Sequence, residues 1–221
     1  ALLVLALGLA LSAQDRVDPY SIPDDLRGGK LAGMNLSGLD LSGRDISGAD
    51  LSGANLTDTN LKNADLSGTV FAGANLQGTR LEVANLSLAK LAGLEFFSVH
   101  VHGARFWAAD LRKTKGWREI HGCDFTNADF RGAHLTDIQF GGGEPPTFGG
   151  AVYDKHTRWP RGFDHKQAQT IRQDDPHDSG IGPDEPADPV EVGSLIEMPG
   201  TVWTGMDLRP MEWRGANLEG S

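Results

Sequence analysis

The chain of 221 residues is 39% apolar and 23% charged, and it contains 29 glycines and one cysteine. The apolar fraction can build a core, which argues against a wholly disordered chain. The single cysteine excludes an intramolecular disulfide framework and a four-cysteine zinc site. The formal net charge of −10 argues against a general binder of nucleic acid or of anionic membranes, because both need a basic surface.

Residues 1–13 are apolar or small, and the first charged side chain is that of Asp15. The run has the length and character of the apolar part of a signal peptide, with small residues such as Ala10 and Ala13 near its end. It is too short to span a bilayer comfortably, so we expect no stable membrane insertion of the mature chain. We interpret 1–14 as a signal-peptide remnant followed by a short lead-in at 15–23, which predicts export to the periplasm or the cell exterior. The alternative is an apolar capping strand or a buried helix.

Residues 24–140 carry an apolar residue at every fifth position. The series starts at Leu26, slips by one residue near Gly116, and resumes from Ile120 to Phe140. We call each of these apolar residues a centre. The residue two positions before a centre is usually small, the residue directly before it is often Asp or Asn, and the second residue after it is often Gly. Such regularity over more than a hundred residues indicates a repeat architecture.

A period of five fits neither regular secondary structure. On an α-helix it would rotate successive centres by about 140°, so no apolar stripe would form. On a flat strand it would place successive centres on opposite faces. The pattern works if the chain turns a corner in each unit, with glycine in the bend, and always directs the centre inward. Four such corners close a coil of 20 residues, and coils would stack at the inter-strand spacing of about 4.8 Å.

Units such as ADLSG (49–53), ANLTD (54–58) and ANLQG (74–78) closely resemble the pentapeptide-repeat family, whose signature is A(D/N)Lxx. The resemblance implies an all-β fold, a right-handed, four-sided β-helix. It implies no single activity, because the family is diverse. Larger residues interrupt the small slot at Leu94, Val99 and Arg118, and we expect local departures from the regular coil there.

Some members of the family resemble duplex DNA in shape and charge and bind type II topoisomerases, which gives one functional hypothesis. That mechanism needs columns of carboxylates along the rod. Residues 24–140 carry 14 acidic and 12 basic side chains, and lysines such as Lys30 and Lys90 interrupt the acidic columns. We therefore keep a DNA-mimicking topoisomerase binder only as the alternative.

The sequence after the repeats changes character three times. Residues 141–164 contain Phe148, Tyr153, Trp159 and Phe163, and predict an irregular cap whose aromatic side chains cover the last coil, with an aromatic ligand pocket as the alternative. The YDxxTRWPxGFD stretch in this segment resembles a segment often found after arrays in pentapeptide-repeat proteins, which supports the cap.

Residues 165–200 are rich in Asp, Glu and Pro and predict an acidic linker. The five-residue period returns in 201–221, which we interpret as the start of a second, truncated repeat block; alternatively these units dock onto the first array.

Three aromatic residues next to centres, Phe97, Trp107 and Trp117, are expected to point outward and to form a partner-binding surface. Cover by the 141–164 segment is the alternative. Cys123 falls in the small inward slot and is expected to be an inert buried thiol.

Residues one coil apart should lie in register, which aligns Lys62, Glu82, His102 and His121 in one outward column. Arg80, His100 and Glu119 lie beside this column. Glu82 and the two histidines could ligate a divalent metal by residue type. We favour solvated charge pairing there and predict no metal site. No catalytic or nucleotide-binding motif is present, so the sequence predicts a non-enzymatic scaffold with no cofactor that binds an unidentified protein partner or serves a structural role outside the cytoplasm.

Overall fold

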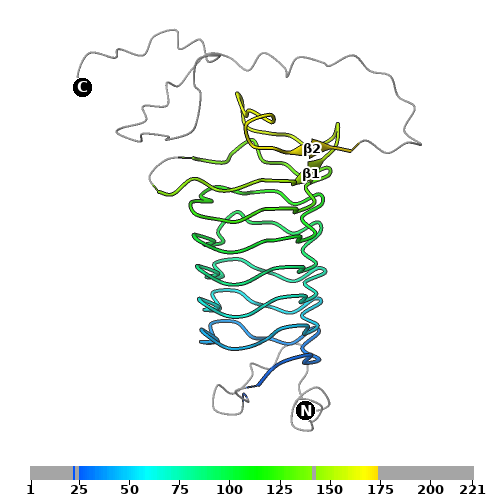
Figure 1. The fold of residues 1–221 in the computed structure, drawn as a ribbon. Coiled ribbons are helices and arrows are strands. Elements are labelled where there is room, and N and C mark those ends of the chain that lie inside the picture. Colours follow the sequence, from blue (N-terminus) through cyan, green and yellow to red (C-terminus); the bar gives the residue numbers. More distant parts are fainter. Residues whose placement is uncertain (1–21, 23–24, 141–142, 174–221) are drawn as a thin grey trace, which may run out of the picture.

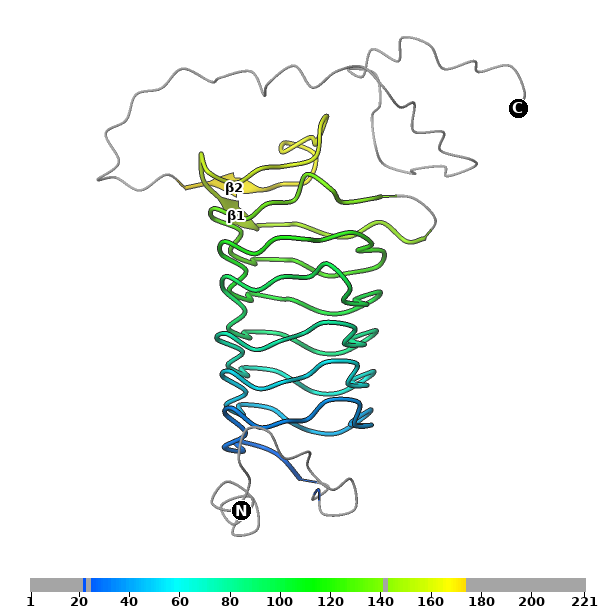
Figure 2. The ribbon, with the colours of Figure 1, turned by 180° about the vertical axis from the view of Figure 1, so that it is seen from behind.

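The computed structural model describes residue 22 and residues 25–140 and 143–173. The predicted signal-peptide remnant, nearly all of the lead-in, the second repeat block and the linker beyond residue 173 lie outside the described residues. Within the described part, the chain winds into a column of stacked coils, with the earliest residues at one end and the aromatic segment at the other (Figures 1 and 2).

Parallel backbone bridges join each coil to the next. The bridges are made by residues directly before the centres, which come four to a coil, so each coil has four sides. The first coil bridges the second at Asp25 with Asp45, Lys30 with Asp50, Asn35 with Asn55 and Asp40 with Asn60. The offset of 20 residues in each pair is the predicted coil length. The two strands in the described part, β1 (Val152–Tyr153) and β2 (Ile171–Arg172), pair in parallel at the far end of the column. The four-sided β-helix predicted from the period is therefore confirmed.

A tight turn follows each centre and makes the corner. In the first unit the Gly29 amide donates to the Leu26 carbonyl oxygen at 3.0 Å, and Gly28 has φ of 60°. A positive φ at this position of a turn is characteristic of type II turns and favours glycine. The acidic residue before a centre supports the same corner, because the Asp45 carboxylate accepts hydrogen bonds from the backbone amide and the hydroxyl of Ser47. Each slot of the five-residue pattern thus has a local structural role.

The centres stack along the axis and form one continuous core. Leu51 is 1% exposed, and the small Ala49 beside it is fully buried. The core changes from leucine to phenylalanine toward the far end, where the rings of Phe106, Phe125 and Phe148 stack with centroid separations of 5.1 and 5.2 Å. Burying each of these side chains contributes about 1.5–3 kcal/mol, so the core accounts for most of the stability of the column.

The predicted slip is real, but the outward position predicted for Trp117 is wrong. Gly116 occupies a centre position, and a Cβ there would lie 2.7 Å from ring atoms of Phe97. The neighbouring Trp117 turns its indole inward to fill the space that Gly116 leaves. It is 2% exposed, stacks on Phe96 at 3.8 Å, and donates its Nε1 hydrogen to Thr114 Oγ1 at 3.0 Å. Trp117 is a core residue in this structure.

The bridge ladder does not end at residue 140, where the sequence analysis placed the end of the array. Thr147 bridges Asp124, and Arg158 bridges His134, so the aromatic segment forms a further coil. The predicted stacking of aromatic side chains on the last coil is present, since Trp159 contacts Phe130 edge to face. Residues 165–173, assigned to the linker from their composition, instead supply β2 and complete this end of the column.

The described residues contain no helix with the length and hydropathy needed to cross a membrane.

Candidate functional site

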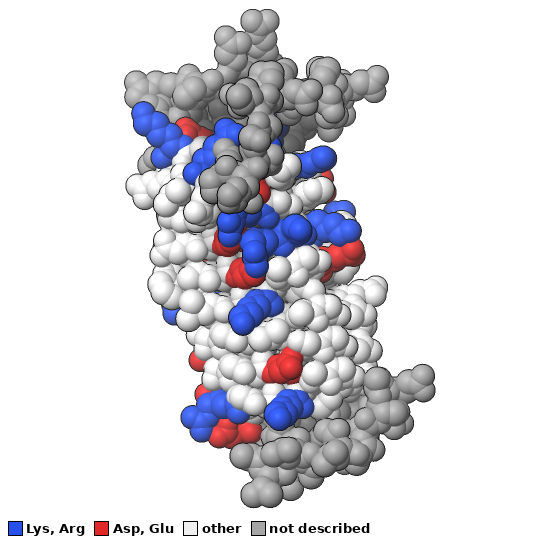
Figure 3. Space-filling view, turned by 90° about the vertical axis from the view of Figure 1, so that its right-hand side faces the viewer, with Lys and Arg blue, Asp and Glu red and all other residues white. Residues whose placement is uncertain are grey.

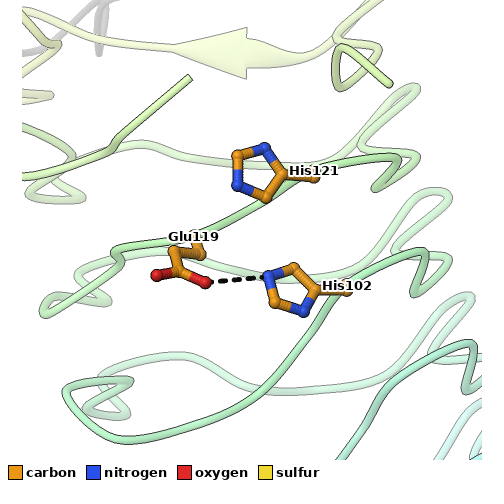
Figure 4. A group of neighbouring side chains, drawn as sticks. All are labelled: His102, Glu119 and His121. Atoms are coloured by element: carbon orange, nitrogen blue, oxygen red, sulfur yellow. Dashed lines mark hydrogen bonds and ion pairs between the residues drawn. The ribbon is translucent and has the colours of Figure 1, made fainter. Parts of the chain in front are cut away.

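Three side chains of metal-ligand type converge on one outer face of the column. His102 and His121 each follow a buried centre, Val101 and Ile120, and Glu119 directly precedes Ile120. Both positions that flank a centre point outward, so Glu119 and His121 emerge from the same face two residues apart. His102 lies one coil below them (Figure 4). We call His102, Glu119 and His121 the histidine cluster.

The geometry of the histidine cluster is compact. His102 Nε2 lies 3.0 Å from Glu119 Oε2, and one ligand atom from each of the three residues lies within 4.8 Å of those of the other two. The imidazoles of His102 and His121 stack with centroids 5.3 Å apart and planes inclined by 16°. The two histidines are half-buried and Glu119 is exposed. A dissolved ion could therefore reach all three ligand atoms from the solvent.

Glu82, which the sequence analysis grouped with the two histidines, belongs to a different interaction. Its Oε1 lies 3.4 Å from Lys62 Nζ and 3.5 Å from Arg80 Nε. Burial by itself raises the pKa of Glu82, but a backbone hydrogen bond and the two positive charges outweigh burial and lower it. Charge pairing, the reading favoured from the sequence, describes Glu82 well.

Glu119 is the residue that sequence reasoning left out of the ligand set. Counting positions in register aligns residues that follow successive centres, which selects Glu82, His102 and His121. It places Glu119, which precedes the centre that His121 follows, beside this column and not among the ligands. The signal that could have found Glu119 is its spacing of two residues from His121 across Ile120.

The two outward aromatic residues do not form one surface. Phe97 is 51% exposed and Trp107 is 42% exposed. They are ten residues apart, which is half a coil, so they lie on opposite sides of the column. Trp107 has an apolar neighbour in Leu88, which is 56% exposed and donates its backbone amide to the Trp107 carbonyl oxygen at 2.8 Å. We call Leu88 and Trp107 the apolar corner.

Basic side chains neutralise many carboxylates on the faces of the column. On the face that carries the ladder from Asp110 through Asp129 to Val152, Arg112 pairs with Asp110 at 2.8 Å and Arg131 with Asp129 at 2.7 Å. Figure 3 shows basic and acidic side chains interspersed in this region. Hydrogen bonds and the charge of Arg112 hold the pKa of Asp110 below its usual range, although burial opposes this. The face therefore has no continuous acidic column.

Several groups that could serve as nucleophiles are engaged in the described part of the fold. Cys123 is buried, donates its thiol to the Val101 carbonyl oxygen, and burial raises its pKa to about 12. A thiol with so high a pKa is not a nucleophile near neutral pH. The serines after the acidic ladder residues donate their hydroxyls locally, as Ser47 does to Asp45 at 2.7 Å.

Comparison with known proteins gives a family match. A family profile described as pentapeptide repeats matches eight copies, over residues 25–58, 49–87, 64–100 and 120–142. Comparison with curated proteins found no match.

Several solved structures are similar to the chain. HetL from the cyanobacterium Nostoc sp. strain PCC 7120, a pentapeptide repeat protein involved in heterocyst differentiation regulation, is 24% identical with a TM-score of 0.43, over 66% of this chain and 76% of HetL. QnrB1, a plasmid-mediated fluoroquinolone resistance protein, is 15% identical with a TM-score of 0.36, over 72% of this chain and 88% of QnrB1. Rfr23, a pentapeptide repeat protein from the cyanobacterium Cyanothece 51142, is 31% identical with a TM-score of 0.21, over 51% of this chain and 65% of Rfr23. With eight matched copies, a coil of four five-residue sides and a turn after nearly every centre, the repeats of this chain are pentapeptide repeats and form a pentapeptide-repeat β-helix.

Proposed function

We propose that this pentapeptide-repeat scaffold is non-enzymatic and binds a protein partner through the apolar corner. The observation that carries the proposal is the exposure of Leu88 and Trp107, at 56% and 42%, on adjacent coils. The equivalent positions of the preceding coils carry small or polar residues, such as Ser67 and Gly68. A tryptophan next to an exposed leucine is typical of the anchor residues of protein interfaces, where burial of aromatic surface provides much of the binding energy.

The distribution of charge favours a protein-binding scaffold over the DNA-mimicking alternative. A surface that imitates the phosphate backbone needs unpaired negative charges at regular intervals. Here Asp25 pairs with Arg27 at 2.7 Å, and Glu95 pairs with Lys115 at 2.8 Å. Together with the pairs of Arg112 and Arg131, these contacts break the acidic columns into local ion pairs.

Site-specific photo-crosslinking tests the apolar corner directly. A photoreactive phenylalanine analogue placed at Trp107 in the source cell is expected to cross-link one defined protein. The matched control carries the analogue at Ser67, which occupies the same position two coils away and is flanked by Gly68 rather than by an exposed leucine. The product should also disappear when Leu88→Ser is added to the Trp107 probe. Equal cross-linking from both positions, or none from Trp107, would reject the apolar corner as the binding surface.

The proposal also places the scaffold outside the cytoplasm, because residues 1–14 have the composition of a signal peptide. Fractionation of the source cell tests this part independently. We expect the protein in the exported fraction, shortened at its N-terminus. Recovery of an unshortened chain from the cytoplasm would refute export and would leave the proposal for the apolar corner standing.

A further inference from the structure

We propose that the histidine cluster binds one divalent transition-metal ion at the surface of the column, and that zinc is the ion it suits best. The proposal goes beyond the scaffold function and involves neither residue of the apolar corner. It rests on the convergence of two imidazoles and one carboxylate from two successive coils, with their ligand atoms within 4.8 Å of one another.

The distances allow the three side chains to hold one ion after a small adjustment. Two ligands at zinc distances in a tetrahedral site are separated by about 3.4 Å. His102 Nε2 and Glu119 Oε2, at 3.0 Å, are already close to that separation. A separation of 4.8 Å, the upper limit in the cluster, must shorten by about 1.4 Å to reach it. The side chains of His102 and Glu119 are 40% and 58% exposed, so rotation about their side-chain bonds can supply this movement.

The type of ligand selects the class of metal. Imidazole nitrogens favour zinc, copper and nickel, whereas calcium and magnesium prefer sites made entirely of oxygen ligands. Two histidines and one carboxylate form a recognised three-ligand zinc set, with water completing the coordination. The fourth position would face the solvent here, because Glu119 projects outward from the column. The ion would therefore be exchangeable, and removable by a chelator.

The backbone holds the ligands in place before any ion binds. Val101 and Ile120, the centres beside the two histidines, are at most 2% exposed and cannot move without disturbing the core. The Gly103 amide donates to the His121 carbonyl oxygen at 2.8 Å, which ties the two coils together directly beside the cluster. Gly143 passes close to His121, and a Cβ at that glycine would lie 3.0 Å from the Cβ of His121. Such preorganisation reduces the entropy that ion binding must overcome.

The location suggests what a bound ion would do to the fold. His102 precedes the slip at Gly116, and Glu119 and His121 follow it. An ion coordinated by all three would cross-link the coil before the slip to the coil after it. Because binding to the folded state alone stabilises a protein by mass action, zinc should raise the midpoint of thermal unfolding.

Isothermal titration of the untagged full chain with zinc chloride tests the proposal. We expect one ion per chain and a rise in the unfolding midpoint with zinc, but neither effect with calcium. His102→Gln and His121→Gln should each weaken zinc binding by at least about tenfold, and Glu119→Gln should weaken it by a smaller factor. The matched control is His100→Gln, because His100 lies in the same coil two residues from His102 but outside the cluster.

Circular dichroism of each variant separates loss of a ligand from loss of the fold. In zinc-free buffer the three cluster variants should unfold at the same temperature as the parent chain within error, since their side chains lie at the surface. The proposal is overturned if zinc does not bind, if binding survives His102→Gln combined with His121→Gln, or if His100→Gln weakens binding as much as the cluster variants do.

Discussion

Replacement of Trp117 by alanine gives the most direct test of the structure at the slip. The side chain is 2% exposed, stacks on Phe96 at 3.8 Å, and meets Phe106 and Phe125 edge to face, each at 5.6 Å. Truncation of a buried tryptophan to alanine costs about 3–5 kcal/mol. We expect the upper part of this range for Trp117→Ala, because Gly116 has no side chain that could move into the cavity and the three aromatic contacts are lost together.

Urea unfolding followed by far-ultraviolet circular dichroism measures this cost. Trp117→Phe keeps an aromatic ring but loses the hydrogen bond to Thr114 Oγ1, so it should cost about 1 kcal/mol, plus the loss of area of the larger ring. Phe97→Ala, at a side chain that is 51% exposed, is the control and should cost no more than about 1 kcal/mol. If Trp117→Ala were as mild as Phe97→Ala, the indole would not be in the core, and the account of the slip given above would be refuted.

Three further changes test other parts of the fold. Val83 has φ of 61°, which is strained for a β-branched residue, so Val83→Gly should stabilise the protein by about 1 kcal/mol in urea unfolding. The control is Val70→Gly, at a ladder position that is not among the positive-φ residues, and it should destabilise the protein by a similar amount. Thr59→Val should cost about 1 kcal/mol because the buried hydroxyl donates to a carbonyl oxygen of the coil below at 2.9 Å, and an unchanged unfolding midpoint would contradict this. Hydrogen bonds from the following serines lower the pKa of Asp40 and Asp50 in the folded state. The two ionised carboxylates therefore stabilise the folded state fully above the unfolded pKa of about 3.9, and this stabilisation is lost as the pH falls through the lower folded pKa. The urea midpoint of unfolding should be level down to about pH 5 and should drop below about pH 4.

The regular part of the fold could be predicted from the sequence because every slot of the repeat has its own physical requirement. A buried centre such as Leu51, a small neighbour such as Ala49 and a turn glycine such as Gly53 repeat together, and no helix or flat strand satisfies all three. The slip was also visible, since the period of five changes phase near Gly116. What the period could not reveal is which side chain fills the interior there. Slot counting assigns Trp117 to an outward position, whereas packing moves it inward to replace the missing centre.

The far end of the column shows a second limit of slot counting. Residues 147–151 read TFGGA, with Phe148 as a buried centre and Gly150 at φ of 70°, so they behave as a repeat unit. The insertion that precedes them lengthens the ladder spacing from 20 to 23 residues between Asp124 and Thr147. Counting in steps of five from the earlier centres therefore does not recognise residues 147–151 as a repeat unit. Likewise, the acidic and Pro-rich composition of residues 165–200 as a whole gave no sign that Ile171 and Arg172 pair with β1.

The repeat itself indicates where on this scaffold function should be sought. In the early coils the position after the centre is most often a small hydroxyl residue, and it completes the turn by hydrogen bonding to the preceding Asp or Asn, as Ser37 and Ser47 do. The fold requires nothing else at that outward position, so a bulky or metal-binding side chain there does not stabilise the turn. Such departures at His102, Trp107 and His121 fall within 20 residues of one another, around the slip. Because the turn does not explain them, the coils that carry them are where we expect a partner and a metal ion to bind, whereas the early coils mainly extend the column.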